Sequence, residues 1–537
     1  MKKKFSVEQI VGVLKQAEVG VPVAELIRTV GISEQTFYRW KKQQLRREFL
    51  KNVSSAALAL AYGSSGSSSA ATTSVQGSGT AGREGLSCGV PAMLLDGPWM
   101  LTPDPTNVGR SQRWYSRRLA GAATTTVPGI IQETFPAQHG VFWHGRDFTP
   151  ATNPHRHGRY LLRFWAVDYL AEVWLNGTLI GRHEGAQTPF VLDATDAIHP
   201  YISNWLVVRV LNPTNDPIDG IVRKQIPQPT MTTGGITESV ELLIAPAVRV
   251  ENVQLKPNWR TGEIKVGITA RNATAITATG NLQLAIAPAA TGETLIAHYI
   301  DCKFLPGDTH SEAQLEVKGH RLWDLNDPYL YRVTARVETP EWNSADETSA
   351  RCGFRDFRVT RGYFRLNGKR IFLRSTHTGN NCPITQILPP GKTDLLRLDL
   401  IYAKASGFNT VRFISGVAHP YELDMCDELG LMVYEESCAA WRLADSPQMK
   451  RRYDFSVQEM ILRDRNHPSI TIWGMLNENN DNPTFHEAVS ALRLVRHLDD
   501  TRLVGGASGR WDGQLGVGSI SKPGSTEWEF EWCQETR

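Results

Sequence analysis

Short apolar runs separated by turn residues dominate the middle of the chain. Between residues 91 and 350, runs rich in β-branched and aromatic residues, such as 159–167 and 204–210, alternate with turn-forming stretches. Regularly spaced short strands of this kind are typical of antiparallel sandwiches. We therefore predict that this part of the chain folds as all-β sandwiches.

The pattern changes near residue 370, where β-type runs alternate with amphipathic helical stretches. The strand candidates are 371–373, 410–414, 431–434, 470–476 and 503–505, and the helix candidates are 394–406, 421–429 and 485–498. Alternating strands and helices predict a parallel barrel or an open parallel sheet. From residue 353 to the end there are 185 residues with about five such strands, against roughly 250 residues in a complete (β/α)8 barrel. We therefore predict an incomplete barrel.

A helical pattern occupies the first 43 residues. Apolar positions recur with helical spacing between Phe5 and Ala17, and a Gly-Ile-Ser turn at 31–33 precedes a further helix over 34–42. Short helices joined by a glycine-containing turn predict a helix-turn-helix, whose last helix would enter the DNA major groove. The residues suited to base edges and phosphates are Gln35, Thr36, Arg39, Lys41 and Lys42. A solvated basic helix on a small bundle is the alternative.

Residues 1–43 resemble the N-terminal helix-turn-helix subunit of insertion-sequence transposases, and we assign a transposase-like domain to residues 1–44. Residues 1–51 contain eleven Lys or Arg and five Glu, whereas the whole chain has a net charge of only +3. A basic head on a slightly acidic body indicates different partners for the two parts, with DNA as the partner of residues 1–44.

The next segment, 45–90, contains two features. Residues 45–51, Leu-Arg-Arg-Glu-Phe-Leu-Lys, and the Ala-rich run 53–61 resemble a twin-arginine export signal, and residues 63–82 form a Gly/Ser-rich linker predicted to be disordered. Because a sorting signal is read at an N-terminus, we expect the chain as written to stay in the cytoplasm, and its ancestral form to be exported. Alternatively, 45–61 is the end of the transposase helix with an apolar linker.

Composition excludes several classes of protein. The seven cysteines are scattered without a C-x-x-C pair or a Cys/His cluster, so neither a disulfide framework nor a metal site is indicated. No apolar run reaches the 18 or more residues of a membrane span. We predict no cofactor and no metal, and the oligomeric state stays open.

The chemically informative stretch is the strand candidate 470–476, which runs directly into Asn-Glu-Asn-Asn at 477–480. Functional groups of a parallel barrel stand at the carboxyl ends of its strands. Glu478 there could act as a general acid/base if apolar neighbours such as Trp473 and Met475 raise its pKa, and Asn477 could hold a sugar hydroxyl. The alternative is a polar loop that caps the next helix.

Residues 95–537 resemble glycoside hydrolase family 2, of the β-galactosidase and β-glucuronidase type. The stretches that carry the resemblance are 167–177, 181–190, 322–331, 353–355, 366–369, 426–436 and 463–469, which lead to Asn477-Glu478. The resemblance implies a jelly-roll sugar-binding domain over 91–243, an immunoglobulin-like sandwich over 244–355 and the N-terminal part of a TIM-barrel catalytic domain over 356–537.

The same resemblance implies site residues. Glu478 would be the acid/base of a retaining β-glycosidase, Asn477 would contact a substrate hydroxyl, and the further substrate-binding candidates are Arg412, Arg374, His377 and Glu436. Phe413-Ile414-Ser415-Gly416 stands where the family often has Ser-His-Tyr-Pro, and Arg374-Ser375-Thr376-His377 departs from Arg-Gly-x-Asn. The identity of the sugar is therefore left open.

Retention requires a second carboxylate about 5–5.5 Å from the acid/base. The family takes it from a later strand, and here only Thr526-Glu527-Trp528-Glu529 weakly resembles that context. This stretch lacks a flanking strand, so we do not assign the role to Glu527 and expect the nucleophile to be missing from a C-terminally truncated chain. The expected function is a glycoside hydrolase of carbohydrate metabolism acting on β-glycosides. The alternatives are a DNA-binding transposase-derived fusion or a carbohydrate-binding protein without catalysis.

Overall fold

The computed structural model describes Arg28 and residues 92–529, except 215, 222–232, 379–394, 438, 441–442, 444 and 509–519. The chain forms two compact units, Met1–Gly77 and Ser78–Arg537, and the following description concerns the second. The predicted helix-turn-helix, the twin-arginine-like segment and the linker lie outside the described residues. The same holds for the DNA-binding candidates Gln35, Thr36, Arg39, Lys41 and Lys42.

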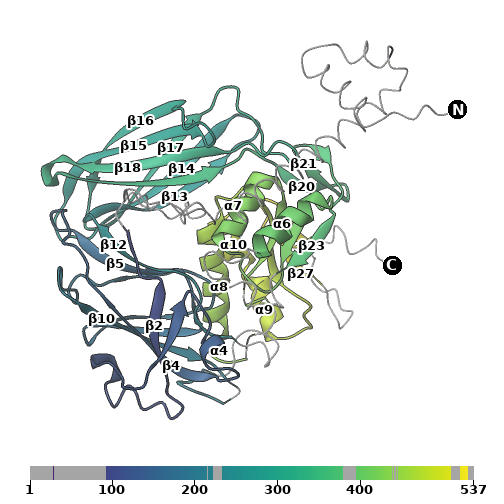
Figure 1. Ribbon diagram of the computed structural model, residues 1–537. Helices are drawn as coiled ribbons and strands as arrows, with labels where there is room; N and C mark the ends of the chain where they lie inside the picture. Colours follow the sequence, from purple (N-terminus) through teal and green to yellow (C-terminus); the bar gives the residue numbers. More distant parts are fainter. Residues whose placement is uncertain are drawn as a thin grey trace. The chain divides into compact units, whose positions relative to one another are not determined.

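The first sandwich consists of two antiparallel sheets (Figure 1). A four-stranded sheet has the order β1-β12-β5-β9, and a six-stranded sheet has the order β3-β2-β4-β10-β7-β8. Trp99, Phe142, Leu162 and Leu206 are among the side chains that fill the core of this sandwich. The elements are β1 (Ala92–Leu94), β2 (Gly97–Pro103), β3 (Ala123–Val127), α4 (Ile131–Thr134), β4 (Gly140–Phe148), β5 (Arg159–Phe164), β6 (Val167–Asp168), β7 (Leu170–Leu175), β8 (Thr178–Glu184), β9 (Phe190–Asp193), β10 (Asn204–Asn212), β11 (Gly235–Ile236) and β12 (Val240–Ala245).

The second sandwich follows after two residues. Its sheets have the orders β13-β14-β17 and β16-β15-β18-β19. Strand β18 alternates buried and half-buried residues along its whole length, because one face of its sheet covers the core and the other meets solvent. The strands are β13 (Val248–Pro257), β14 (Glu263–Asn272), β15 (Ala278–Pro288), β16 (Ile296–Phe304), β17 (Gly307–Glu316), β18 (Tyr331–Thr339) and β19 (Ser344–Cys352).

The third part carries a parallel sheet with helices packed on it. Its order is β23-β24-β25-β26-β27-β28, in which the first five strands are parallel and β28 is antiparallel. The elements are β20 (Phe357–Thr360), β21 (Tyr363–Leu366), β22 (Lys369–Arg370), β23 (Ser375–Thr378), α6 (Leu395–Ala405), β24 (Thr410–Phe413), α7 (Pro420–Leu429), β25 (Met432–Glu436), α8 (Met449–Asp464), β26 (Ile470–Leu476), α9 (Pro483–Ser490), α10 (Leu492–Leu498), β27 (Leu503–Ala507) and β28 (Ile520–Ser521).

The predicted strands and helices of this part are confirmed with two corrections. The expected strand at 371–373 is wrong. The Ile371 N–H donates to the Phe364 carbonyl of β21 at 2.9 Å, and the Asn409 side chain donates to the Phe372 carbonyl at 2.9 Å and accepts the Arg374 N–H at 2.8 Å. The strand begins only at Ser375. The helix expected at 485–498 is divided into α9 and α10 at Ala491.

Both sandwiches contact the parallel-sheet part through arginines. Arg463 on α8 donates from Nη1 to the Gln187 carbonyl of the first sandwich at 3.1 Å. Arg351 of the second sandwich pairs with Asp424 and, at 2.7 Å, with Glu428 on α7. These ion pairs and hydrogen bonds hold the sheet and its helices against both sandwiches.

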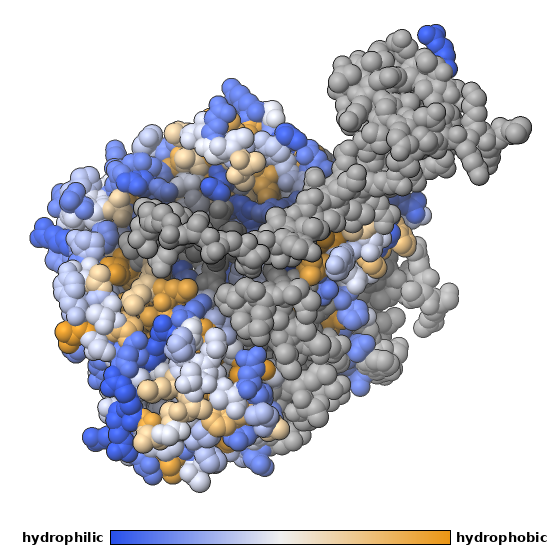
Figure 2. Space-filling model, viewed as in Figure 1, coloured by the Kyte–Doolittle hydropathy of each residue, from blue (hydrophilic) through white to orange (hydrophobic). Residues whose placement is uncertain are grey.

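The visible surface mixes hydrophilic residues with smaller apolar areas (Figure 2). This is the ordinary distribution for a surface that faces water. None of the helices that the structure describes is both long and apolar enough to cross a bilayer.

A buried ion pair closes the amino end of strand β26. Arg502 donates from Nη1 to Asp499 at 2.7 Å, from Nε to the Ile470 carbonyl at 2.9 Å and from Nη2 to the His467 carbonyl at 2.7 Å. Asp499 also accepts the indole N–H of Trp473 at 2.7 Å. Burial alone would raise the pKa of Asp499, but Arg502 and the hydrogen bonds from Thr501 and Trp473 hold it well below its usual value.

Replacement of Asp499 by Ala is expected to lower the free energy of unfolding by about 3–5 kcal/mol, because Arg502 would keep its buried charge without the carboxylate. The urea midpoint of tryptophan fluorescence measures this change. Asp500→Ala is the matched control, since the Asp500 side chain is 52% exposed and pairs only at the surface with Lys256. We expect that control to cost less than about 1 kcal/mol. Equal midpoints for the two variants would contradict a structural role for the Arg502–Asp499 pair.

Candidate active site at the carboxyl end of the parallel sheet

Glu478 stands immediately after the buried strand β26. Every residue of Ile470–Leu476 is buried, whereas the Glu478 side chain is exposed. Its backbone has φ +42°, and its N–H donates to Ser508 Oγ, after β27, at 3.3 Å. A left-handed conformation is strained for a residue with a Cβ and is concentrated at functional positions. The turn therefore presents a carboxylate to solvent at the end of a rigid strand.

Asn477 is held in one orientation beside Glu478. It is 3% exposed, and its N–H donates to the Ala440 carbonyl at 2.8 Å. Its side-chain Oδ1 accepts two hydrogen bonds of 2.9 Å, from Arg412 Nη2 and from Ser508 Oγ. Because both contacts occupy the oxygen, the amide nitrogen is the group of Asn477 that can donate to a ligand.

Arg412 and Glu436 form the base of the site. Arg412 Nε donates to Glu436 Oε1 at 2.9 Å, and the Ser415 N–H donates to Glu436 Oε2 at 2.9 Å. The Arg412 guanidinium also lies 4.8 Å from the centre of the Tyr434 ring. Burial raises the pKa of Glu436, although the charge of Arg412 opposes the shift. The side chain of Glu436 is fully buried and bonded to Arg412, so it orients that guanidinium, and a contact of Glu436 with substrate stays a prediction from the sequence.

The other two predicted substrate-binding residues are separated by the structure. His377 on β23 pairs in register with Arg412 on β24 and is exposed, so it lies toward the carboxyl end of the sheet. Arg374 precedes β23, and its Nε donates to the Gly407 carbonyl at 2.7 Å, before β24 begins. Parallel strands place that position at the amino end of the sheet. The Arg374 side chain is thus held away from Glu478, and its substrate-binding role stays a prediction from the sequence.

The sequence suggested Trp473 and Met475 as apolar neighbours of the Glu478 carboxylate. Trp473 and Met475 are fully buried in the core between the sheet and its helices, and Trp473 points its indole nitrogen at Asp499. Helix α9 is capped by Asn482, two residues beyond the stretch 477–480, since its Oδ1 accepts the Phe485 N–H at 2.9 Å. Capping and the presentation of Glu478 are thus performed by different residues of one loop.

Glu527 does not lie among these groups. Strand β28 runs antiparallel to β27, so the chain after Ser521 heads toward the amino end of β27. Arg496 on α10 donates to the Ser525 carbonyl at 2.6 Å, and Trp528 donates to the Val489 carbonyl at 3.2 Å. These contacts bind the loop around Glu527 to the helical layer. The structure gives Glu527 no contact with the Glu478 site.

Several residues of the site carried no sequence signal. Ser508 and Ser415 contribute single polar groups, and only their position just after strands β27 and β24 could have indicated them. Gly474 has a steric role, because a Cβ there would meet Tyr434 Cε2 at 2.3 Å and Glu436 Cγ at 2.5 Å. A glycine on the buried strand therefore makes room for the two side chains that position Arg412.

One group of side chains has the donor types of a metal site. Donor atoms of Asp424, Asp427 and His467 lie within 4.8 Å of one another. Arg351 pairs with Asp424, while Asp427 pairs with His467 at 2.7 Å and accepts the Ser469 N–H at 2.9 Å. These contacts form an ion-pair network between the second sandwich and the parallel-sheet part, and we assign no metal to it.

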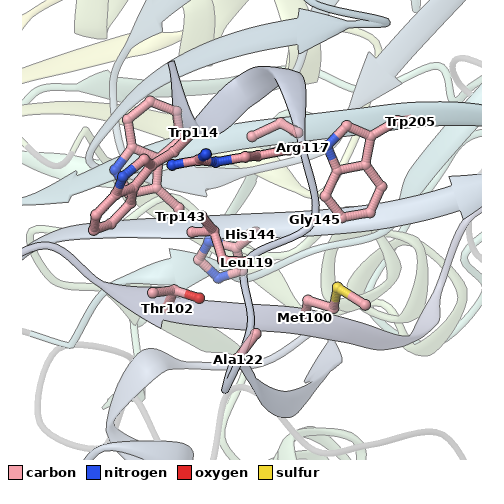
Figure 3. A pocket seen from close by; sticks show the side chains of 11 residues that line it. Met100, Thr102, Trp114, Arg117, Leu119, Ala122, Trp143, His144, Gly145 and Trp205 are labelled. Carbon is pink, nitrogen blue, oxygen red and sulfur yellow. The ribbon is translucent and has the colours of Figure 1, made fainter. Parts of the chain in front are cut away.

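A tryptophan-lined pocket lies on the six-stranded sheet of the first sandwich (Figure 3). In this view the Arg117 side chain lies between Trp114 and Trp205, and Trp143 lies 6.1 Å from Trp114 between ring centres. The cavity measures only about 10 Å³, roughly the space of one water molecule.

Family models match both parts of the chain. A model described as "Glycosyl hydrolases family 2, TIM barrel domain" matches residues 357–522, and one described as "Glycosyl hydrolases family 2" matches residues 248–355. A third, described as "Transposase", matches residues 1–61. These matches confirm the two resemblances predicted from the sequence.

Curated relatives are named β-galactosidase. The protein from Thermoanaerobacterium thermosulfurigenes is 26% identical over 354 residues, which cover 64% of this chain and 48% of the relative. The protein from Pectobacterium atrosepticum is 29% identical over 460 residues, covering 78% of this chain and 43% of the relative. The chain thus spans less than half the length of these two relatives.

Solved structures share the fold. A β-galacturonidase from Eisenbergiella tayi bound to galacturonate aligns with a TM-score of 0.64 and 23% identity, covering 78% of this chain and 71% of that one. The β-glucuronidase from Parabacteroides merdae aligns with a TM-score of 0.67 and 23% identity, covering 77% and 55%. These likenesses confirm the predicted sandwiches followed by TIM-barrel elements.

A pH effect on stability is expected from His144, which lines the tryptophan pocket. Burial lowers the pKa of His144 to about 3, far below the ordinary value of 6.5. The neutral ring therefore contributes stability that is complete above pH 6.5 and is lost as the pH falls toward 3. At about pH 5 the loss is about 2 kcal/mol.

His144→Leu removes this titration. When the pH falls from about 7.5 to about 5, the variant should gain about 2 kcal/mol in its free energy of unfolding relative to the wild type. Urea unfolding at both values measures it. A difference that is the same at the two values would show that His144 does not titrate as its burial requires.

Proposed function

Because the chain belongs to glycosyl hydrolase family 2 over residues 248–522, we propose that its site hydrolyses O-glycosyl bonds of β-glycosides, with Glu478 as general acid/base. One observation carries the assignment. Glu478 is an exposed carboxylate in a left-handed turn at the carboxyl end of a fully buried strand, beside an amide that Arg412 orients. A substrate oxygen at that edge of the sheet would meet a proton donor and a hydrogen-bond donor together.

Each residue then has a distinct task. Glu478 gives its proton to the leaving-group oxygen as the glycosidic bond breaks. The amide nitrogen of Asn477 donates to a sugar hydroxyl, and such a bond strengthens as positive charge develops on the ring. Arg412 fixes Asn477, and Glu436 in turn fixes Arg412. His377, exposed on the neighbouring strand, is the further candidate for contact with the sugar.

The proposed stereochemical class is retention, which needs a carboxylate nucleophile. Among the described carboxylates, Glu436 is fully buried and used by Arg412, and Glu527 is bound in a loop beside the helices. We therefore propose that an external carboxylate can take the nucleophile's place. Formate would attack the anomeric carbon with inversion as Glu478 protonates the departing oxygen. Water would then displace formate from the same carbon with a second inversion and give its proton to the Glu478 carboxylate.

The test uses the whole chain with p-nitrophenyl β-galactoside and p-nitrophenyl β-glucuronide. We expect release of nitrophenol to increase when sodium formate is added. Glu478→Gln should lower the formate-supported rate by about 10²–10⁴-fold on the corresponding methyl β-glycosides, monitored by release of the free sugar, because an alkoxide leaving group needs the acid. The effect on the nitrophenyl substrates should be smaller, because nitrophenolate leaves without protonation. Absorbance of the released phenol gives the rate.

Glu527→Gln is the matched control, because it makes the same chemical change in a loop away from the site. Its rate should equal that of the wild type with and without formate. A loss of rate in this variant would make Glu527 a participant and contradict the proposed arrangement. Sugar binding without turnover under either condition would favour the carbohydrate-binding alternative.

A second function is favoured by the transposase match to residues 1–61. We propose that residues 1–44 bind duplex DNA through Gln35, Thr36, Arg39, Lys41 and Lys42. Replacement of Lys41 and Lys42 by Ala should weaken binding to all sequences similarly and reduce its dependence on salt, because phosphate contacts release counterions. Gel shifts at several salt concentrations measure both effects. Affinity of the wild type that does not change with salt would contradict phosphate contacts.

A further inference from the structure

A second cavity lies between the first sandwich and helix α8, apart from the groups around Glu478. Its volume is about 200 Å³, enough for a small organic molecule rather than a single water. The strand β8 and the loop that follows it supply one wall, and the first turns of α8 supply the other. Arg452 on α8 pairs with Glu184 on β8 at 2.6 Å, which holds the two walls together.

The charged side chains around this cavity have an excess of positive charge. Those that line it are three arginines, Arg182, Arg451 and Arg452, and one carboxylate, Glu184. Glu184 is engaged by Arg452 and, at 3.4 Å, by Arg451. The partner of Arg182 is Glu172, at 2.9 Å.

Glu172 does not balance that excess. It also pairs with Arg110 at 2.6 Å and with Arg209 at 3.1 Å, and both of these arginines share Asp219. Together the two groups of ion pairs contain five guanidinium groups and three carboxylates. The Arg451 and Arg182 side chains are 68% and 63% exposed, so their guanidinium groups can meet an anion that enters from solvent.

His183 lines the cavity and carries an unpartnered ring nitrogen. The residue is only 8% exposed, and its Nε2 is a buried atom without a hydrogen-bond partner among the described residues. Burial lowers the pKa of His183 to about 4, so the ring is neutral at pH 7. A buried polar atom without a partner costs free energy, which a ligand that reaches it would recover.

Aromatic rings lie at the cavity and behind its wall. The His183 ring stacks on Phe190 with 4.3 Å between centroids, and Phe455 on α8 lies 5.8 Å from His183. Phe455 lines the cavity and remains 37% exposed. A cavity with apolar rings and a few directed polar groups has the usual character of a small-molecule site.

We propose that this cavity is a second carbohydrate site that binds a sugar acid, whose carboxylate pairs with Arg451 and Arg182 and whose ring hydroxyl hydrogen-bonds to His183 Nε2. Guanidinium groups bind carboxylates through parallel hydrogen bonds, which a neutral sugar cannot form. A hydroxyl both donates and accepts, so it matches a neutral imidazole nitrogen in either tautomer. The choice of a sugar acid rests on the proposed function, whereas the cavity and its charge do not.

The experiment is calorimetric titration of the full chain with D-glucuronate, with D-glucose and sodium acetate as comparison ligands. We expect glucuronate to bind with a dissociation constant in the millimolar range, and glucose and acetate to bind at least about tenfold more weakly. Arg451→Gln should weaken glucuronate about tenfold through loss of a charge-assisted contact. His183→Leu should weaken it severalfold without affecting acetate.

Two controls separate this site from the proposed active site. Arg493→Gln changes an exposed arginine on α10 and should leave the affinity unchanged. Glu478→Gln should also leave it unchanged, so a failure of the proposed glycosidase would not remove this binding. The proposal is overturned if glucose binds as tightly as glucuronate, or if acetate does. It is also overturned if the affinity is insensitive to Arg451→Gln while Glu478→Gln abolishes it.

Discussion

The site at Glu478 depends on the hydrogen bonds that hold the opposite, amino end of strand β26. Arg502 inserts a buried guanidinium at the amino end of the strand, where it binds Asp499 and the carbonyls of Ile470 and His467. Arg355 adds a hydrogen bond of 2.7 Å to the same Ile470 carbonyl. These carbonyls belong to the start of the strand and the turn before it, so the two arginines satisfy groups that would otherwise be buried without donors. A strand anchored in this way can support a strained turn at Glu478.

Arginine also connects the three parts of the second unit. Arg463 reaches the first sandwich, Arg351 carries the second sandwich onto α7, and Arg412 links strands β24, β25 and the turn after β26. The planar guanidinium supplies several donors from one buried group and remains charged when desolvated. It can therefore join backbone carbonyls and carboxylates from elements far apart in sequence. These arginine contacts add to apolar packing between the second sandwich and the sheet, where Trp323 and Leu330 lie in one buried cluster with Met432 and Ile472.

The Glu478 site and the cavity between β8 and α8 both contain arginine–carboxylate pairs, but their balance of charge differs. Near Glu478 the positive charge of Arg412 is neutralised by its ion pair with Glu436. The remaining exposed group is the Glu478 carboxyl group, beside the neutral amide of Asn477. Between β8 and α8 the arginines outnumber the carboxylates, and the buried imidazole is neutral. The first arrangement suits proton transfer to a leaving group, and the second suits an anion. The sign of the local charge, rather than residue type alone, distinguishes the proposed functions of the two sites.

The sequence by itself determined the order of the sandwiches, the strand Ile470–Leu476 and the placement of Glu478 after it, because these follow from local periodicity and from the rule that barrel chemistry stands at strand ends. Tertiary structure alone decided which residues meet there. Asn409 bonds the segment before β23, register places Arg374 at the amino end of the sheet, and Glu436 is buried as the partner of Arg412. Hydrogen bonds between strands distant in sequence leave no periodic trace, so Ser508 and the cavity at His183 emerged only from the folded chain.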